Sequence, residues 1–559
     1  MPFAAGCAGR AAAPGGLSGP VQVQVLAIND LHGALEPPDG GAGRVGSVTA
    51  GGMAYLASHL ARLEARNPHT AVVSAGDNIG ASSLLSSLFH DEPTIEALNA
   101  IGLDVSAVGN HELDEGWAEL ARMQRGGCHP RDGCQDGTPF SGASFQFLTA
   151  NVQVDPARVD PAALAASGWK GATSDGGTLF PPYAVRTFGG VKVGFVGVAL
   201  RGVPALVGPS MVRGLTFAPE AAAANVVVDE LVRQGVRAIV VLIHEGGSLP
   251  EGVPDPCADL TGEIVGIVGQ LSPEVDVVVS GHTHRDYTCT IGSALVTSAG
   301  SFGRMITDID LTIDRRSGQV LSKSARNVVV TRDVPPDAAQ AAIVSRYRGL
   351  SAKEVQRPVG SIAAPILRDA EASGESPLGR VLTDAFLSAA RAPDAGRAVV
   401  AFINGGGIRS DLAASGGGGT LTFGDVHRAL PFGNQWLVKT LTGEAIVRLL
   451  EEQFDNPRPG DDAVLQVSEG FTYTYRRSQP KGKRVDRASV RLSGEPLDPG
   501  ARYRVAMPDF LWNGGDRFTA VAEGVDPAAA GLDLDLFVAY AETHQPLAAP
   551  TAPRITRLP

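Results

Sequence analysis

The sequence is short of cysteine, of positive charge and of long apolar runs. It has 5 cysteines in 559 residues and no Cys-x-x-Cys pair, so a structural zinc site built from thiolates is not expected. Lys and Arg together number 47 against 59 Asp and Glu, and the net charge of −12 argues against binding to nucleic-acid polymers or anionic membranes. An apolar run of about 18 residues, which a membrane-spanning helix needs, is absent, so we expect no transmembrane segment.

The length of the chain predicts more than one domain. A chain of 559 residues is too long for a single hydrophobic core, so we expect two large domains or more. The hydrophobic content of 44% and the charged content of 19% are those of an ordinary soluble globular protein. We expect a monomer. If its substrate is anionic, the positive potential must be local and come from metal ions or a few arginines.

Four of the cysteines suggest two disulfides. Cys128 and Cys134 bracket a short loop, while Cys257 and Cys289 flank the apolar run of residues 275–280. Four cysteines permit three pairings. We prefer Cys128–Cys134 and Cys257–Cys289, because each pair is close in sequence or flanks one strand, and this pairing predicts an oxidising compartment. The alternative is four reduced thiols.

The first residues carry a weak targeting signal. Residues 1–20 are rich in Ala and Gly and lack both the charged and the apolar regions of a signal peptide. Residues 4–7 resemble the end of a lipoprotein cleavage site, which would give the fifth cysteine, Cys7, a lipid anchor. We therefore expect a disordered tail over residues 1–20, a truncated signal, and a periplasmic, secreted or cell-surface protein.

Polar side chains follow five predicted strands. The apolar runs at residues 21–28, 70–75, 103–108, 238–243 and 275–280 read as strands of an α/β sheet. In such sheets functional groups lie in the loops just past the carboxyl ends of the strands. Five of the 11 histidines fall there, and the whole set is Asp30, His32, Asp77, Asn110, His111, His244, His282 and His284.

These side chains have the chemistry of a metal centre. Asp30 and His32 are two residues apart, so in extended backbone they would share one side. The set offers oxygen and imidazole but no thiolate, which suits Zn, Mn, Fe or Co. Apart from His111, the set holds seven candidates, which are too many for one ion and right for two ions that share a carboxylate. We expect His111 to stay off the metals, with Asp114 fixing its tautomer and raising its pKa.

As a set, these motifs resemble a known family. Residues 29–33, 76–78, 109–112, 244 and 281–284 resemble calcineurin-like metallophosphoesterases. Residues 404–409, 431–433 and 514–516 resemble the C-terminal domain of 5′-nucleotidases. The resemblance covers about residues 21–530 and identifies the bacterial periplasmic 5′-nucleotidase/UDP-sugar hydrolase family.

The resemblance implies an α/β fold in two parts. We expect a four-layer α/β/β/α metallophosphoesterase sandwich over residues 21–332 and a helical linker or hinge over residues 333–357. A second α/β domain of 5′-nucleotidase C-terminal type, which binds substrate, would span residues 358–545. Residues 546–559 would form a loosely ordered tail.

The resemblance also assigns roles. Asp30, His32 and His284 would hold one divalent ion, and Asn110, His244 and His282 a second. Asp77 would bridge the two ions, and His111 with Asp114 would form the catalytic dyad. The substrate-binding residues of the second domain would be Arg368, Asn404, Arg409, Phe432, Phe510 and Asp516, with the two phenylalanines stacking on a base. Ala372 stands where relatives often carry a second arginine, which leaves the substrate preference open.

The implied function is removal of phosphate from 5′-nucleotides by metal-activated water, with UDP-sugars or related compounds as further substrates. One alternative is a 2′,3′-cyclic-nucleotide phosphodiesterase/3′-nucleotidase or another hydrolase of the superfamily. The Phe432/Phe510 pair speaks against the sulfur-oxidation enzyme of that superfamily. A second alternative, a nucleotide-binding protein on an inactive phosphatase fold, would lack metal ligands, and none is missing here.

Overall fold

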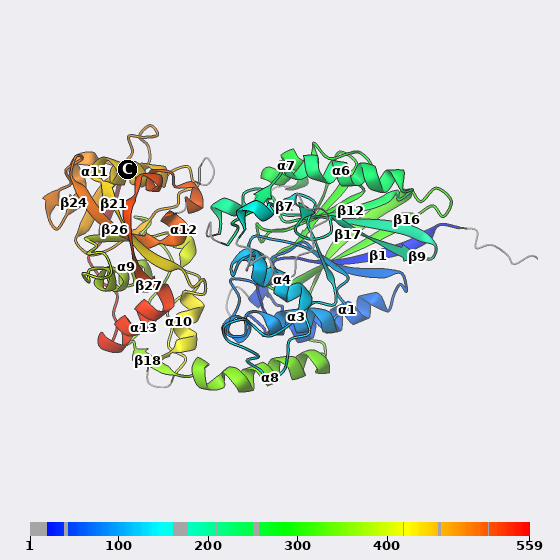
Figure 1. The fold of residues 1–559 in the computed structure, drawn as a ribbon, viewed down its shortest axis with the longest axis horizontal. Coiled ribbons are helices and arrows are strands. Elements are labelled where there is room, and N and C mark those ends of the chain that lie inside the picture. The colour runs from blue at the N-terminus through cyan, green and yellow to red at the C-terminus, as the bar shows by residue number, and fades with distance from the viewer. Residues whose placement is uncertain are drawn as a thin grey trace, which may run out of the picture.

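A computed structural model describes residues 19–38, 43–159, 177–207, 211–249, 256–416, 419–456, 460–512 and 514–559. The chain forms two α/β halves connected by the long helix α8 (Ala338–Val355), which runs along the lower edge of the view in Figure 1. Cys7, and with it the expected lipid anchor, lies outside the described residues, as do residues 1–18 of the expected tail. Within the described ranges, no helix has the length and apolarity needed to cross a membrane.

Two six-stranded sheets form the N-terminal half. The first has the order β17-β16-β1-β4-β5-β6, and the second has the order β14-β15-β13-β12-β10-β9. The first consists of β1 (Val21–Ile28), β4 (Thr70–Ser74), β5 (Val105–Ala107), β6 (Gln146–Leu148), β16 (Met305–Ile313) and β17 (Val320–Val329). The second consists of β9 (Tyr183–Phe188), β10 (Val191–Val198), β12 (Ala238–Ile243), β13 (Val277–Ser280), β14 (Asp286–Ile291) and β15 (Ala294–Ala299).

The two sheets pack face to face. Val23 and Val25 of β1 lie in one buried cluster with Phe195 of β10 and Val240 of β12. Helices α1 (Met53–Glu64), α3 (Glu92–Ala100) and α4 (Trp117–Arg125) cover the outer face of the first sheet. Helices α6 (Glu220–Arg233) and α7 (Glu263–Val268) cover the second. The central strands are buried on both faces, which is why they read as continuous apolar runs. The expected four-layer α/β/β/α arrangement is confirmed.

The second half is built on a five-stranded sheet of order β22-β19-β26-β21-β27 with a separate four-stranded sheet, β25-β24-β23-β28. One apolar cluster packs α9 (Pro377–Ala390), α10 (Phe423–Ala429) and α13 (Asp533–Thr543) on one face, and another packs α11 (Gly443–Glu452) on the other. The strands are β19 (Val400–Ile403), β21 (Gln435–Thr442), β22 (Gln466–Val467), β23 (Phe471–Arg476), β24 (Arg491–Leu492), β25 (Glu495–Pro496), β26 (Arg502–Pro508), β27 (Val525–Leu532) and β28 (Ile555–Leu558). A further pair, β18 (Pro358–Ser361) with β20 (Thr420–Thr422), lies beside α13.

Helix α8 is fixed to the N-terminal half. Its Tyr347 is fully buried against the ring of Phe89, with ring centroids 4.8 Å apart, and its hydroxyl donates to Glu96 over 3.1 Å. The Asp337 side chain caps the helix by accepting the N–H of Gln340 at 2.9 Å. The C-terminal end of α8 then reaches α10 of the second half.

The chain end differs from the expected loose tail. Strand β28 pairs in parallel with β23 of the second half. Arg554, just before it, is buried, donates to Asp384 over 2.6 Å and uses its N–H to bond Glu375 over 2.9 Å. The Pro- and Ala-rich composition of residues 546–553 suggested disorder, but the short apolar strand behind them completes a sheet.

Both expected disulfides are present. Cys128 is bonded to Cys134 and Cys257 to Cys289, with Cα–Cα distances of 4.7 Å and 5.4 Å. Disulfides of this kind persist in oxidising compartments, which supports a location outside the cytoplasm.

Candidate active site between the two halves

The strand-end residues of both sheets converge. Three groups of side chains each bring their ligand atoms within 4.8 Å of one another. The groups are Asp30 with His32 and His284, His32 with Asp77 and His111, and Asp77 with His244 and His282. They come from the loops after β1, β4, β5, β12 and β13, so the convergence follows from parallel strands ending at one edge of each sheet.

The first group presents two imidazole nitrogens to each other. The His32 Nδ1–H donates to the carbonyl of Gly80 over 2.9 Å, which leaves Nε2 as the free lone pair of a neutral ring. That Nε2 lies 3.0 Å from Nε2 of His284, which in turn lies 3.4 Å from an Asp30 oxygen. Such convergence of unprotonated nitrogens and a carboxylate fits a divalent cation.

Asp77 links the two other groups. Its Oδ2 lies 2.9 Å from Nε2 of His244 and 3.9 Å from Nε2 of His32. The His244 Nδ1–H donates to the carbonyl of Ala75 over 2.9 Å, so Nε2 is again the nitrogen that faces the centre. Asn110 adds a buried side-chain oxygen with no hydrogen-bond partner among the described residues. A buried oxygen without a partner is costly, and a cation would satisfy it.

Some of the protonation states already match those of metal ligands, and two differ. Burial lowers the pKa of His282 to about 3 and that of His284 to about 4, so both rings are neutral. Burial opposes ionisation of Asp77, but His244 and His111 hold its pKa well below the ordinary value. Neutral imidazole and ionised carboxylate are the forms that bind metal.

The two groups that differ are His244 and Asp30. Burial alone would lower the pKa of His244, but Asp77 raises it to about 10, and burial raises the pKa of Asp30 to about 7. A bound cation would displace the proton between Asp77 and His244.

The candidate ligands sit on strained backbone. Five of them have a positive φ, which is uncommon outside glycine: Asp30 (50°), His32 (48°), Asp77 (50°), His282 (70°) and His284 (56°). Each such residue costs on the order of 1–3 kcal/mol and persists where its surroundings hold it. The expectation that Asp30 and His32 share a side through extended backbone is therefore wrong. Their side chains meet because the chain turns sharply after β1.

The expected dyad is formed. His111 lies in the 3-10 turn His111–Leu113, and its Nδ1 is 2.8 Å from Oδ2 of Asp114. The same Oδ2 accepts the N–H of Ala81 over 3.1 Å, which holds the carboxylate in place. Burial alone would lower the pKa of His111, but Asp114 and Asp77 raise it to about 9. His111 is therefore a protonated imidazole at neutral pH, able to donate a proton.

Glu112 is a supporting residue that the sequence analysis did not assign. Its buried carboxylate accepts the N–H groups of Gly109, Asp77 and Asn78 at 2.7, 2.8 and 2.8 Å. Burial, followed by Asp77, raises the pKa of Glu112 to about 7. The loops after β4 and β5 are thus held together by one side chain. A charged residue inside a strand-end motif was the available signal, but its inward direction could not be read from the sequence.

A cavity of about 460 Å³ joins the two halves at this centre. Both halves line it: Asp77, Asn110, His111, Asp114, His282 and His284 from the first, and Asn404, Arg409, Phe432, Phe510 and Asp516 from the second. The Asn404 side-chain amide donates to Asp516 over 2.8 Å, and the Arg409 guanidinium lies 5.4 Å from the centre of the Phe432 ring. Five of the six residues expected to bind substrate therefore line the cavity that the dyad also lines.

Arg368 is the sixth, and it lies elsewhere. Its side chain is exposed and donates to the backbone carbonyl of Arg409 over 2.6 Å, while its N–H donates to Asp411 over 2.8 Å. It lines a neighbouring cavity together with Glu371. In this position Arg368 supports the loop that carries Arg409.

Several cavity-lining residues had no signal in the sequence: Leu206, Val207, Met211, Asn434 and Asp509. The first three come from the irregular segment between β10 and α6, where no periodicity indicates which side chain turns inward.

Comparison with known proteins assigns the family. Residues 23–286 match the family described as calcineurin-like phosphoesterase, and residues 358–523 match the 5′-nucleotidase C-terminal domain. The chain belongs to the 5′-nucleotidase-type metallophosphoesterases. These proteins are hydrolases, and a metallophosphoesterase fold implies divalent metal ions, for which the strand-end groups offer candidate ligands.

Three relatives illustrate the likeness. Cell wall protein Lmo0130 of Listeria monocytogenes is 31% identical over 549 residues, which cover 93% of this chain and 67% of that protein. Endonuclease YhcR of Bacillus subtilis is 30% identical over 538 residues, covering 94% of this chain but 40% of the relative, so the chain spans less than half of it. The structure of a 5′-nucleotidase precursor from Thermus thermophilus has a TM-score of 0.72 at 26% identity and covers 96% of this chain and 99% of that one.

Proposed function

We propose that this chain is a two-metal phosphohydrolase that removes phosphate from 5′-nucleotides. The observation that carries the proposal is the shared cavity, in which metal-type ligands and the His111–Asp114 dyad face Phe432, Phe510 and Arg409. A phosphate ester at the metal side would leave its nucleoside on the aromatic side. UDP-sugars and other nucleotide diphosphate compounds would fit the same arrangement.

The metal ligands would divide as the motifs imply. Asp30, His32 and His284 would hold one ion, Asn110, His244 and His282 would hold the other, and Asp77 would serve both; Zn, Mn, Fe and Co suit this donor set. When bound, such ions neutralise phosphate charge and activate water for in-line attack. The unpartnered oxygen of Asn110 and the facing imidazole nitrogens of His32 and His284 support this assignment.

The chain's own residues would donate the proton to the leaving group and bind the phosphate and the base. Asp114 fixes His111 through Nδ1, which leaves the opposite nitrogen, Nε2, to donate a proton to the leaving oxygen. Arg409 would attract the phosphate or a second phosphoryl group. Phe432 and Phe510 would stack on the base, and the Asn404–Asp516 pair would bond its edge or the ribose.

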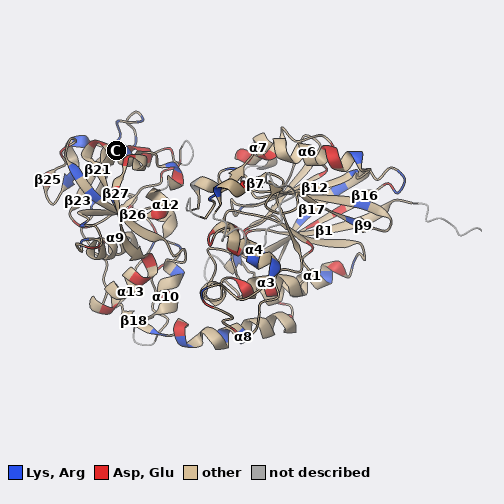
Figure 2. Cartoon of the chain, in the orientation of Figure 1, with Lys and Arg blue, Asp and Glu red and all other residues tan. Residues whose placement is uncertain are grey.

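The charge distribution favours a mononucleotide over a polymer. Lys and Arg are interspersed with Asp and Glu over both halves (Figure 2), and the net charge is −12. A nucleic-acid polymer needs an extended basic surface for its phosphates. The likeness to an endonuclease makes phosphodiester cleavage, including cleavage of 2′,3′-cyclic nucleotides, the second candidate.

We also propose that the protein works in the periplasm, at the cell surface or after secretion. The two disulfides and the likeness to a cell wall protein support this location. Within the chain, residues 21–332 would form the catalytic domain, and residues 333–357, mostly α8, would link the two domains. Because α8 is fixed to the first half, the hinge would lie at its C-terminal end. The second domain would start at residue 358 and would include β28, because that strand completes its sheet.

A substrate panel tests the function. Enzyme reconstituted with Zn, Mn, Fe or Co would be assayed on AMP, a UDP-sugar, a 2′,3′-cyclic nucleotide, single-stranded DNA and p-nitrophenyl phosphate. We expect the highest kcat/KM on a 5′-nucleotide. Preference for the cyclic nucleotide or for DNA would replace the monoesterase proposal by the diesterase alternative. Nucleotide binding without turnover on any substrate would indicate a binding protein.

A further inference from the structure

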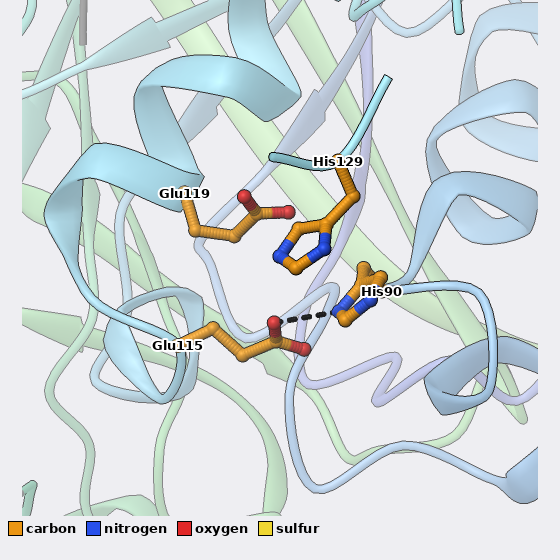
Figure 3. Close-up of side chains that lie close together, drawn as sticks. All are labelled: His90, Glu115, Glu119 and His129. Atoms are coloured by element: carbon orange, nitrogen blue, oxygen red, sulfur yellow. Dashed lines mark hydrogen bonds and ion pairs between the residues drawn. The ribbon is translucent and has the colours of Figure 1, made fainter. Parts of the chain in front are cut away.

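A second group of metal-type side chains lies outside the active site. His90, Glu115, Glu119 and His129 place one ligand atom each within 4.8 Å of the others. Figure 3 shows the four side chains pointing toward a common centre, from the loop before α3, the turn before α4, α4 itself and the disulfide loop. The resemblance to known families gave none of these four residues a role.

The two imidazoles are held by one carboxylate. His90 and His129 stack with ring centroids 3.7 Å apart and planes 18° apart. Oδ2 of Asp132 lies 2.8 Å from Nε2 of His90 and 3.1 Å from Nδ1 of His129. In the structure Nδ1 of His129 accepts the N–H of Asp132 over 3.2 Å, so Nε2 carries the proton of that ring. Metal binding would require the other tautomer of His129, with protons on Nδ1 of His129 and Nε2 of His90 facing Asp132 and lone pairs on Nε2 of His129 and Nδ1 of His90. This is how a carboxylate behind metal-binding histidines fixes their tautomers.

The carboxylates complete the donor set. Oε2 of Glu115 lies 2.8 Å from Nδ1 of His90, the nitrogen that Asp132 leaves free. Oε1 of Glu119 accepts the Nε–H and Nη2–H groups of Arg122 at 2.9 and 2.6 Å, and Oε2 accepts the same Nε–H at 3.0 Å. Glu119 faces His129 (Figure 3), and its Oε2 retains a further lone pair. Two imidazoles with two carboxylates form a set that suits zinc and similar ions.

The local charge also favours a cation. Four carboxylates gather here, those of Glu92, Glu115, Glu119 and Asp132, and Arg122 pairs with two of them. Without a metal, the negative charge that Arg122 does not balance is balanced in part by a protonated His90, whose two ring nitrogens both contact carboxylates. A divalent ion in place of the proton between His90 and Glu115 would balance this charge better than one imidazolium does.

We propose that His90, His129, Glu115 and Glu119 bind one divalent transition-metal ion of the zinc class, with Asp132 orienting the two histidines. The ion would connect the Cys128–Cys134 loop to the start of α4. Its position is next to the dyad, because a small cavity of about 90 Å³ is lined by His90, Glu115 and Glu119 and also by His111 and Asp114. The ion would thus stabilise the turn that carries Asp114. The proposal does not depend on the substrate of the enzyme.

Zinc titration of the full chain, freed of metal with a chelator, tests the site. Glu115→Gln keeps the size of the side chain while removing its charge, and His90→Ala/His129→Ala removes both imidazoles. We expect each variant to bind one equivalent of Zn²⁺ fewer than the parent by isothermal titration and elemental analysis. The matched control is His69→Ala/His544→Ala, which removes two histidines that belong to none of the candidate metal groups and should bind as the parent does.

A complementary variant separates this site from the active site. Asp77→Ala/His244→Ala should lose active-site metal and retain the ion at His90 and His129. Zinc should then still raise its melting temperature, and the added Glu115→Gln substitution should abolish that shift. Equal zinc stoichiometry in the parent, Glu115→Gln and the double-histidine variant would overturn the proposal and leave the cluster as an ion-pair network around a charged His90.

Discussion

Phe432 of the C-terminal half lies nearly parallel to the His111 imidazole, with ring centroids 6.0 Å apart and planes 20° apart. The Arg409 guanidinium lies 5.4 Å from the centre of the same Phe432 ring. Phe432 is therefore part of the environment of the dyad as well as a candidate base-stacking surface. Phe510, on α12 (Asp509–Trp512), lines the same cavity beside Gly515. The two phenylalanines should not behave alike when they are replaced.

Replacing Phe510 should impair nucleotides selectively. Loss of one base–aromatic stack costs roughly 1–3 kcal/mol, or about ten- to a hundred-fold in kcat/KM. We expect Phe510→Ala to lower kcat/KM for AMP by that factor and to leave p-nitrophenyl phosphate hydrolysis near the parent rate. Steady-state kinetics measure the change in kcat/KM for AMP and for p-nitrophenyl phosphate.

Phe432→Ala is the matched comparison. Because Phe432 contacts His111, this variant should lose activity on AMP and also, to a smaller extent, on p-nitrophenyl phosphate. Equal losses on both substrates in Phe510→Ala would mean that Phe510 supports the fold and does not stack on a base.

Metal content should depend on Asp77. Its Oδ2 lies between the imidazoles of His244 and His32, at 2.9 and 3.9 Å, so removing it takes a ligand from both proposed ions. Asp77→Ala should abolish activity and reduce bound metal in elemental analysis.

The control for this prediction is Asp229→Ala, at an exposed position on α6, which should keep the activity and the metal content of the parent. A fully active parent preparation that contains no transition metal would refute the two-metal proposal.

His111 should affect turnover without affecting metal content. Removal of a general acid typically lowers the rate by about 10²–10⁴-fold, and we expect that loss in kcat for His111→Ala. The backbone N–H of residue 111 donates to Asp77 over 2.9 Å and survives the substitution, so the ligand loop should keep its shape. Activity and metal content measured on the same samples test this role. A parallel fall in both would make His111 a metal ligand.

Much of the fold could be predicted from local pattern. The sequence predicts a hairpin over residues 183–198, with Gly189 and Gly190 at its turn, an apolar strand over residues 238–243 and a helix over residues 377–390. The hairpin of β9 and β10, strand β12 and helix α9 occupy those residues. The sequence also predicts a helix over residues 114–123, but α4 begins later, at Trp117, because a 3-10 turn at residues 111–113 comes first and places Asp114 next to His111. That turn is set by contacts to the β4 loop, which lies elsewhere in the sequence.

The site was predictable in composition but not in shape. Parallel strands end at one edge of a sheet, and the two sheets pack face to face, so the strand-end residues His32, Asp77 and His244 could be grouped from the sequence. The left-handed backbone at Asp30 and His32 could not be predicted, because it depends on segments far away in the chain. The N–H of Asp30 donates to the carbonyl of Gly76, and the carbonyl of Asp30 accepts the N–H of Phe302. Strand β28 was missed for a similar reason, since its pairing with β23 joins distant segments.

Acid should weaken the contact between the two halves. Nε2 of His427, on α10, lies 3.0 Å from the hydroxyl of Ser87 on α2 (Leu84–Ser87), and its Nδ1 is buried with no hydrogen-bond partner in the part of the chain that the structure describes. Burial, and then Arg428, lower the pKa of His427 to about 4. The unfolded chain takes up this proton near pH 6.5, so the folded state keeps this stability above pH 6.5 and loses it as pH falls toward 4. The loss approaches about 3 kcal/mol.

His427→Gln tests this assignment, because glutamine can still bond Ser87 but does not titrate. Thermal unfolding of the parent and the variant at pH 7, 5.5 and 4 should show the difference between them shrinking, or reversing in favour of the variant, as the pH falls. Carboxylates that titrate in the same range are common to both proteins and cancel in that difference. His544→Gln, at an exposed position, should follow the parent at every pH. If the difference between the parent and His427→Gln stays constant from pH 7 to 4, His427 is not the group that couples proton uptake to the interface.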